Sequence, residues 1–359
     1  MRLAPKKLID LDRTLDWSAD DQRTVDYLRA LAADAVQKVG NGHPGTAMSL
    51  APAAYLLFNK IMTHDPKDPQ WLGRDRFVLS AGHSSLTLYS QLFLCGYPLS
   101  MDDLKSFRTL GSLAPGHPEF GHTVGVETTT GPLGQGLATA VGMAMSERFE
   151  AGLFPQSPFA HRVWVIASDG DLQEGISGEA SSLAGTQKLG HLNVIWDDNR
   201  ISIEGDTQVA FTEDVSNRYR AYGWDVHEVD MAANGDVDIT ALHAAMVAAA
   251  NTAGAPSFIR MRTTIAWPAP HARGTAKSHG SALGEVEVAA LKQELGLDPQ
   301  ESFAFDPALV DRVRAALGER TAHARKNWDA DLATWRKEQA PAAALLDRLV
   351  AKELPADLA

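Results

Sequence analysis

Short apolar runs alternate along this chain with segments in which apolar residues recur at helical spacing. The strand candidates cover residues 76–80, 163–167, 192–196, 224–229 and 258–263. The clearest helical patterns cover residues 20–39, 47–62, 84–94, 134–149, 214–222, 239–253 and 284–295. This alternation predicts an α/β fold, with a doubly wound, mostly parallel sheet that carries helices on both faces.

The pattern changes near residue 306. Residues 306–359 are helical in pattern, highly charged and without a strand candidate. They predict a helical arm or interdomain linker that follows a domain formed by residues 1–305. The earlier helix at 134–149 is rich in glycine and alanine, which lets another backbone come close. We therefore expect that helix to pack deep in the fold or at a subunit contact.

The strongest chemical signal lies between residues 162 and 199. One apolar strand runs into Asp169 and Gly170, a small-residue helix follows at 178–189, and a second apolar strand runs into Asn199. Such a βαβ unit makes the strands parallel neighbours, so their carboxyl ends meet at the edge where open α/β sheets bind ligands. A carboxylate and an amide oxygen there suit Mg²⁺ or Ca²⁺, and the glycine lets a phosphate approach. The unit predicts a metal-bridged diphosphate site.

Several histidines occur beside glycine in loop-like contexts, namely His43, His83, His117 and His279. A single histidine of this kind more often caps a helix or lies at the edge of a core. Four in one chain indicate a ligand site, where an imidazole donates to an oxyanion or moves a proton. His83 precedes a predicted helix, which suits phosphate oxygens. We expect the remaining histidines at the surface, among them His64, His161, His227 and His243.

A second glycine-rich loop, residues 128–136, opens onto the helix at 134–149. It does not support a dinucleotide site, because GxGxxG is absent and no acidic residue follows at ribose spacing. It is either a tight helix-entry turn or a wall against a flat ligand, with Leu133 as the apolar contact. Asp169 and Asp171 also suggest a metal-dependent phosphatase, but residues 172–186 offer no basic group to balance a transferring phosphoryl group.

Composition narrows the classes of partner. The 359 residues allow about two domains, and 45% of them are hydrophobic, enough for a sizeable core. A net charge of −12 argues against nucleic acid or an anionic membrane as the main partner. No apolar run is long enough for a membrane span, and residues 1–17 lack the apolar stretch of a secretory signal. Cys95 is the single cysteine and is expected in the core, so a cytoplasmic protein fits.

Six motifs in one order then resemble the N-terminal, pyrophosphate-binding domain of the transketolase family, over about residues 23–355. They lie at residues 40–45, 76–83, 115–119, 130–136, 169–175 and 197–199. The resemblance implies thiamine diphosphate as cofactor, bridged to the protein by Mg²⁺ or Ca²⁺. It implies a two-carbon ketol transfer from a ketose phosphate to an aldose phosphate, with sugar phosphates as partners.

The resemblance also implies roles for individual residues. The metal ligands would be Asp169, the Asn199 side chain and the backbone carbonyl of Ile201. The cofactor would be contacted by His83, Gly131, Pro132, Leu133, Gly170, Asn199 and His279. Substrate hydroxyls and proton transfer would involve His43, His117 and His279, with His43 and His279 binding the substrate. Glu174 resembles a buried acid near the twofold axis of the family dimer, where it would couple two active sites.

Two departures from the family pattern concern the site. Ser168 stands where glycine is usual, and its small side chain is expected to have little effect. Residues 265–271 lack a glycine-rich turn, so the path to His279 is the weakest part of the match. The family's pyrimidine-binding domain, with its catalytic glutamate, does not occur in this sequence. The resemblance therefore implies half of a site, completed in a homodimer or by a partner chain.

Two alternatives remain open. One is a related ketol transferase with another acceptor, such as formaldehyde in dihydroxyacetone synthase, or a sulfosugar. The other is a catalytically silent binding subunit that keeps the fold and the dimer surface. Binding of thiamine diphosphate by this chain alone separates a cofactor-holding domain from a silent one.

Overall fold

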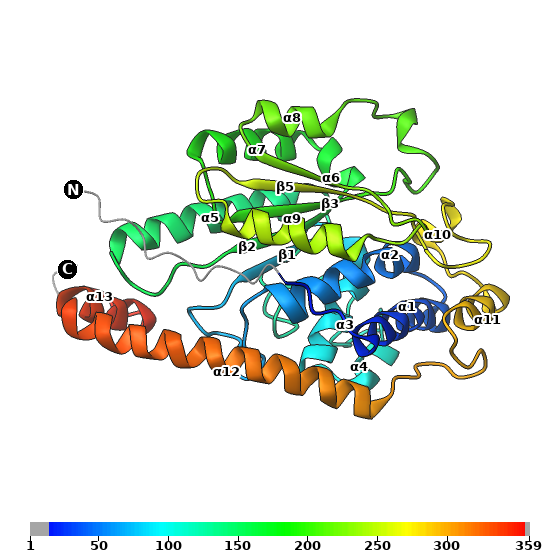
Figure 1. The fold of residues 1–359 in the computed structure, drawn as a ribbon, viewed down its shortest axis with the longest axis horizontal. Helices are drawn as coiled ribbons and strands as arrows, with labels where there is room; N and C mark the ends of the chain where they lie inside the picture. The colour runs from blue at the N-terminus through cyan, green and yellow to red at the C-terminus, as the bar shows by residue number, and fades with distance from the viewer. Residues whose placement is uncertain (1–13, 356–359) are drawn as a thin grey trace.

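The centre of the molecule is a five-stranded parallel sheet, as a computed structural model that describes residues 14–355 shows (Figure 1). The strands are β1 (Arg76–Leu79), β2 (Val163–Ser168), β3 (Leu192–Asp198), β4 (Asp225–Val229) and β5 (Ser257–Arg262). Their order across the sheet is β1-β2-β3-β5-β4, and every neighbouring pair is parallel. All five strands expected from the apolar runs are confirmed, and so is the doubly wound α/β fold.

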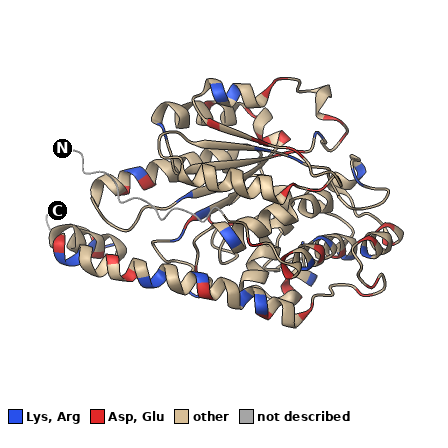
Figure 2. Cartoon of the chain, in the orientation of Figure 1, with Lys and Arg blue, Asp and Glu red and all other residues tan. Residues whose placement is uncertain are grey.

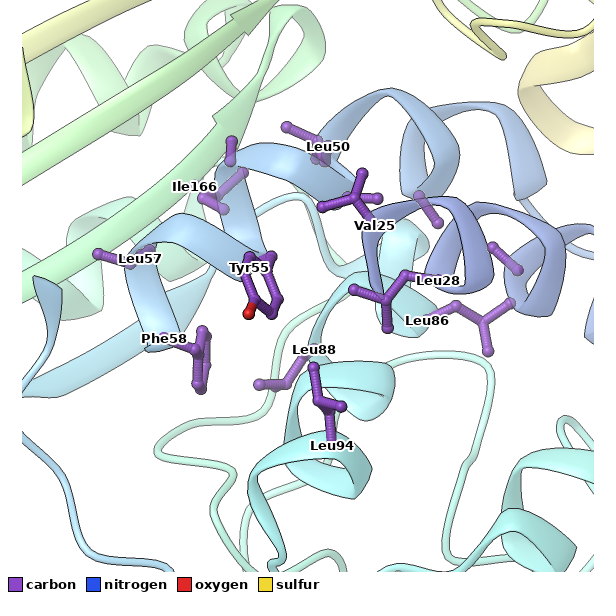
Figure 3. Packing of buried hydrophobic residues seen from close by; sticks show 14 of the residues in the cluster. Val25, Leu28, Leu50, Tyr55, Leu57, Phe58, Leu86, Leu88, Leu94 and Ile166 are labelled. Atoms are coloured by element: carbon purple, nitrogen blue, oxygen red, sulfur yellow. The ribbon is translucent and has the colours of Figure 1, made fainter. Parts of the chain in front are cut away.

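Helices cover both faces of the sheet, and alternate strand residues enter two different cores. On β2, Trp164 and Ile166 belong to one cluster, whereas Val163 and Val165 belong to the other. The first cluster contains α1 (Ala19–Val39), α2 (Pro44–Leu56), α3 (Ser85–Cys95) and α9 (Ile239–Asn251). The second contains α5 (Gln135–Leu153), α7 (Gly175–Gln187) and α8 (Val215–Ala221). Figure 3 shows side chains of α1, α2 and α3 gathered beside Ile166 of β2. Strands buried on both faces explain the continuous apolar runs.

Helix ends differ from the sequence pattern where a local feature sets them. α2 begins at Pro44, three residues before the expected start, because the fixed φ of proline suits the first helical position. It then passes at Leu57 into a π-helical turn, Leu57–Ile61. α7 likewise starts at Gly175, earlier than expected. Elements too short to show a period were missed or lay outside the expected ranges: α4 (Met101–Lys105), α6 (Asp169–Gln173), α10 (Lys277–Gly280) and two 3-10 turns, Gly82–Ser84 and Thr207–Val209.

α5 has one buried and one exposed face. Residues such as Leu137 and Val141 pack on the sheet, whereas Met145 and Phe149 are exposed. The expectation that this helix packs deep is therefore confirmed for one face. A subunit contact on the other face stays a prediction.

The region after residue 306 is helical, as expected, and lies along the domain rather than away from it (Figure 1). It consists of α12 (Pro307–Glu338) and α13 (Ala340–Val350), preceded by α11 (Glu285–Glu294). The indole nitrogens of Trp328 and Trp335 donate to the carbonyls of Pro158 and Pro155, at 2.6 and 3.1 Å. Figure 2 shows basic and acidic residues interspersed along α12. A role as linker to a further domain stays a prediction.

Three histidines that were expected at the surface are buried instead, namely His64, His161 and His243. His64 shows why: its ring nitrogens lie 2.8 Å from the carbonyl oxygen of Phe58 and 3.1 Å from the hydroxyl of Tyr97. A buried imidazole is tolerated when both nitrogens have partners. Cys95 is buried, as predicted. Within residues 14–355, no helix combines the length and apolarity that crossing a membrane requires. The N-terminal stretch screened for a secretory signal lies mostly outside the described residues.

Burial of His64 predicts a loss of stability in mild acid. Burial lowers the pKa of His64 to about 4, so the unfolded chain binds a proton more readily as the pH falls below about 6.5. Between pH 7 and pH 5 this residue alone should reduce the free energy of unfolding by about 2 kcal/mol. Urea unfolding at both pH values measures the change. His64→Gln should show a pH-dependent loss that is smaller by that amount, and equal losses in the two proteins would contradict the assignment.

Candidate functional site

The carboxyl ends of β2 and β3 bring the predicted metal ligands to one edge of the sheet. The strands pair in parallel, with Ser168 opposite Asp197, so Asp169 and Asn199 directly follow the ends of neighbouring strands. The Asp169 carboxylate accepts from the indole nitrogen of Trp196 at 3.0 Å and from the backbone nitrogen of Arg200 at 2.9 Å. These bonds hold the carboxylate against the turn that follows β3.

The turn after β3 carries the other expected ligands. The amide oxygen of Asn199 accepts from the backbone nitrogen of Ile201 at 2.8 Å, and its amide nitrogen donates to Asp197 at 2.9 Å. Asn199 is buried and Ile201 is half-buried. The side chain of Asn199 is thus fixed with its oxygen directed at the following backbone.

A cavity of about 230 Å³ opens at this edge and gathers most of the predicted site. Its lining contains His43, His83, His117, Gly131, Leu133, Asp169, Gly170, Asn199, Ile201 and His279. These residues come from seven separate parts of the chain, so their convergence is a result of the fold. Pro132 and Glu174 are the two predicted residues outside the lining, and both are exposed.

Three of the histidines contact one another across the cavity. The ring centroids of His43, His83 and His279 lie 5.0 to 5.4 Å apart. Within residues 14–355, one nitrogen of each ring is buried without a hydrogen-bond partner: Nδ1 of His43, Nε2 of His83 and Nδ1 of His279. Buried polar atoms are seldom left unpaired, so these nitrogens are suited to a ligand.

Burial also keeps these imidazoles uncharged. It lowers the pKa of His43 to about 4, with further lowering from His279, and it lowers the pKa of His83 well below the usual value. Burial likewise lowers the pKa of His117 and His279. Near neutral pH each ring therefore offers one donor and one acceptor.

Glycines allow two loops to meet at the cavity. A Cβ added to Gly170 would lie 2.8 Å from Cδ1 of Leu133, and one added to Gly82 would lie 2.7 Å from the backbone nitrogen of Gly131. A larger residue at either position would force the loops apart. Of the two interpretations of the loop at 128–136, the structure supports a wall of the cavity that is also the entry to α5.

The acid at the sheet edge lacks a compensating charge. Burial, together with the neighbouring Asp197 and Asp198, raises the pKa of Asp169 to about 8. A cation beside Asp169 would favour its charged form. Among residues 14–355, no cluster of three or more His, Cys, Asp or Glu side chains is placed to hold a metal. One carboxylate, one amide oxygen and one backbone carbonyl remain an oxygen-donor set that fits Mg²⁺ or Ca²⁺.

A larger cavity, about 510 Å³, shares Asp169 with the first but is otherwise lined by different residues. Three of its charged groups, Asp198, Glu228 and Arg260, already pair with one another. Arg260 donates to Asp198 at 2.7 Å and lies 3.5 Å from Glu228. Because the smaller cavity holds the unpaired imidazole nitrogens, it is the better candidate for the site.

The expectation that Ser168 has little effect on the site stays a prediction, but its side chain has a structural role. Its hydroxyl accepts from the backbone nitrogen of Asp171 at 3.4 Å, while its own nitrogen and hydroxyl donate to the Asp171 carboxylate at 2.8 and 3.1 Å. This is a capping box at the start of α6, which the serine and the aspartate three residues later could have indicated. Sequence reasoning missed the structural role of Asp171. It also missed Thr46, whose buried hydroxyl lines the cavity without a partner and gives no signal in the sequence.

Glu174 lies at the end of α6, next to the start of α5. A Cβ added to Gly134 would approach its Cβ to 2.8 Å. The side chain is exposed in this single chain. Its predicted burial near a twofold axis therefore requires a second subunit and stays a prediction.

Comparisons with known proteins agree on one family. A family model described as "Transketolase, thiamine diphosphate binding domain" matches residues 20–355. The transketolase of Mycobacterium leprae is 54% identical over 346 residues, which are 95% of this chain and 49% of that protein. The transketolase of Geobacillus stearothermophilus is 43% identical over 338 residues, 93% of this chain and 50% of that protein.

Solved structures are similar to the same extent. A crystal structure of Pichia stipitis transketolase in complex with sedoheptulose 7-phosphate superposes with a TM-score of 0.89 and 42% identity, over 95% of this chain and 50% of that chain. Transketolase from Leishmania mexicana gives a TM-score of 0.89 at 40% identity, over 95% and 51%. The chain spans about half the length of the curated relatives it matches.

The histidine cluster should titrate below the usual range. We expect His43 to have a pKa near 4, because burial disfavours its charged form and His279 adds repulsion. A pH titration of histidine-labelled protein by NMR measures this value, with the His43 signal assigned by its loss in His43→Gln. A His43 signal that titrates at the ordinary value of about 6.5 would mean that water reaches the ring.

Proposed function

The chain belongs to the transketolase family, and we propose that it holds the diphosphate and thiazolium portion of thiamine diphosphate together with a divalent cation. We further propose that, with a pyrimidine-binding domain, it transfers a two-carbon ketol unit from a ketose phosphate to an aldose phosphate. The observation that carries the proposal is the cavity at the edge of β2 and β3, where four histidines, two glycine loops and the Asp169–Asn199 pair converge.

The size of the cavity supports a site that a second domain completes. Its volume of about 230 Å³ falls below the roughly 300–1,000 Å³ typical of pockets for small molecules. A homodimer, or a partner chain that carries the pyrimidine-binding domain, would supply the remaining walls. The exposed face of α5, with Met145 and Phe149, and the neighbouring Glu174 are our candidates for the subunit contact. In the proposed dimer, Glu174 would become buried and couple two sites.

The chain's residues would hold the cofactor by three kinds of contact. Asp169, Asn199 and the carbonyl of Ile201 would bind the cation that neutralises the diphosphate. His83 and the backbone at Gly170 would contact the diphosphate itself. The ring would lie against Gly131, Pro132 and Leu133. When bound, thiamine diphosphate supplies the carbon that carries the transferred two-carbon unit.

Neutral imidazoles would act on the substrate. His43, His117 and His279 each offer a donor and an acceptor at neutral pH, and two of these rings have a buried nitrogen without a partner. They would hydrogen-bond substrate hydroxyls and accept or return protons during bond cleavage and formation. His279, the residue with the weakest motif, lines the cavity and contacts both His43 and His83.

Sugar phosphates are the proposed substrates because a relative binds one. The Pichia stipitis transketolase was solved with sedoheptulose 7-phosphate. We propose the same substrate class here, in the cytoplasm. The choice of acceptor substrate would depend on residues of the pyrimidine-binding domain that face the cavity. An activity assay therefore distinguishes an aldose phosphate acceptor from formaldehyde or a sulfosugar.

Cofactor binding by the chain alone tests the metal assignment. We expect thiamine diphosphate with Mg²⁺ to bind at roughly millimolar affinity, about −4 kcal/mol, because only half of the contacts are present. Asp169→Asn should abolish this binding, since the cation would lose its carboxylate. Ligand-observed NMR measures both proteins. The control is Asp238→Asn, which removes a helix-capping aspartate that does not line the cavity. Equal binding by Asp169→Asn and the wild type would refute the site.

Turnover with xylulose 5-phosphate and ribose 5-phosphate tests the reaction. With a pyrimidine-binding half supplied, His117→Ala should lower kcat by about 10²–10⁴, the usual contribution of a positioned acid or base. His271→Ala is the matched control, because His271 is exposed and pairs with Glu287 away from the cavity. Absence of turnover despite cofactor binding would favour a silent binding subunit, and turnover only with formaldehyde would favour the alternative acceptor.

A further inference from the structure

Asp171 does not itself line the cavity of the candidate site, but it bonds Ser168, which does. Its side chain is fully buried within the described chain. One carboxylate oxygen accepts from the hydroxyl of Ser80 and from the backbone nitrogen of Gly134, both at 2.8 Å. The other accepts from the nitrogen and hydroxyl of Ser168 at 2.8 and 3.1 Å. All four of these groups are donors, and none of them belongs to a basic side chain.

These bonds connect three segments that wall the cavity. Ser80 follows β1 and leads to Gly82 and His83, while Ser168 ends β2 immediately before Asp169. Gly134 is the first residue before α5 and ends the loop that contains Leu133. The ends of two strands and the start of one helix therefore meet on a single carboxylate.

Ser80 extends this network into α5. Its hydroxyl donates to Asp171 and accepts from the backbone nitrogen of Leu137 at 2.9 Å. A Cβ added to Gly136 would lie 2.6 Å from the Cα of Ser80, so helix and strand end are in close contact. The N-terminus of a helix as long as α5 favours a negative group, which explains how the carboxylate is accommodated without a cation.

We propose that Asp171 is a positioning residue that sets the distance between the loop at 130–134 and the start of α6, and thereby the width of the diphosphate subsite. The identity of the ligand in this inference rests on the proposed function, whereas the hydrogen bonds of Asp171 are independent of it. Gly170 and Leu133 lie on opposite walls of that gap, at the contact noted above. Because every partner of Asp171 is a donor, only a side chain with two acceptor oxygens forms all of these hydrogen bonds. An amide would place its NH₂ against donors.

The chain contains a matched control. Ser100 and Asp103 form the same capping box at the start of α4, with nitrogen and hydroxyl of Ser100 donating to one oxygen at 2.7 and 2.5 Å. In that box Ser100 is exposed and Asp103 is half-buried, and within residues 14–355 the Asp103 carboxylate accepts side-chain and backbone bonds from Ser100 and from no other segment. A comparison of substitutions at Asp171 and at Asp103 therefore separates the effect of losing a helix cap from the effect of losing the bonds to Ser80 and Gly134.

Hydrogen–deuterium exchange without cofactor tests the network directly. Asp171→Asn and the milder Ser80→Ala should raise amide exchange at residues 130–137 at least tenfold. Asp103→Asn should leave that segment within about twofold of the wild type. Unchanged exchange at 130–137 in both site variants would overturn the inference. Ser80→Ala keeps the test decisive if Asp171→Asn does not fold.

Affinity then shows whether the network positions the cofactor or only stabilises the fold. In ligand-observed NMR with Mg²⁺, both site variants should bind thiamine diphosphate at least tenfold more weakly. His64→Gln, destabilised in a core remote from the cavity, should bind within about twofold of the wild type. Wild-type affinity in both site variants, or an equal loss in His64→Gln, would overturn the positioning role and leave the proposed function standing. A wild-type chain that does not bind the cofactor would refute the proposed function, while exchange would still decide the role of Asp171.

Discussion

The parallel pairing of β2 with β3 is the constraint on which the rest of the site depends. Its register sets Ser168 opposite Asp197, and both strands are buried along their whole length. Since alternate residues enter two separate cores, a shift by one residue would exchange the two faces of a strand. The hydrophobic cores therefore fix where Asp169 and Asn199 emerge. β1 pairs with β2 and delivers His83 to the same edge.

Electrostatics at this edge follow from the same burial. Removal from water keeps four imidazoles neutral and raises the pKa of Asp169, an acid with no basic partner in the cavity lining. Such a site suits a ligand that brings its own cation and many oxygen acceptors, as a metal–diphosphate does. Neutral rings with unpaired nitrogens also leave both donors and acceptors free for hydroxyl groups. The electrostatics of the cavity and the chemistry proposed for it are therefore consistent.

Much of this arrangement could be predicted from local sequence patterns. The predictions that failed did so for physical reasons. All five strands were found, the clearest being β2 and β3, which are buried along their whole length. Glycine-flanked histidines indicated the cavity. His64 was misjudged because its burial depends on Phe58 and Tyr97, which no local pattern relates to it. The bonds of Asp171 to Ser80 and Gly134 were missed because they join segments distant in sequence. The environment of Glu174 cannot follow from one chain if a second subunit covers it.

Diffraction from crystals of the chain grown with Mn²⁺ and thiamine diphosphate tests the central claim most directly, because the anomalous signal of manganese locates the ion. The account predicts a single strong peak with oxygen ligands from the Asp169 carboxylate, the Asn199 amide and the Ile201 carbonyl, each at about 2.0–2.3 Å. A cofactor bound with the ion elsewhere, or coordination that omits either side chain, would contradict it.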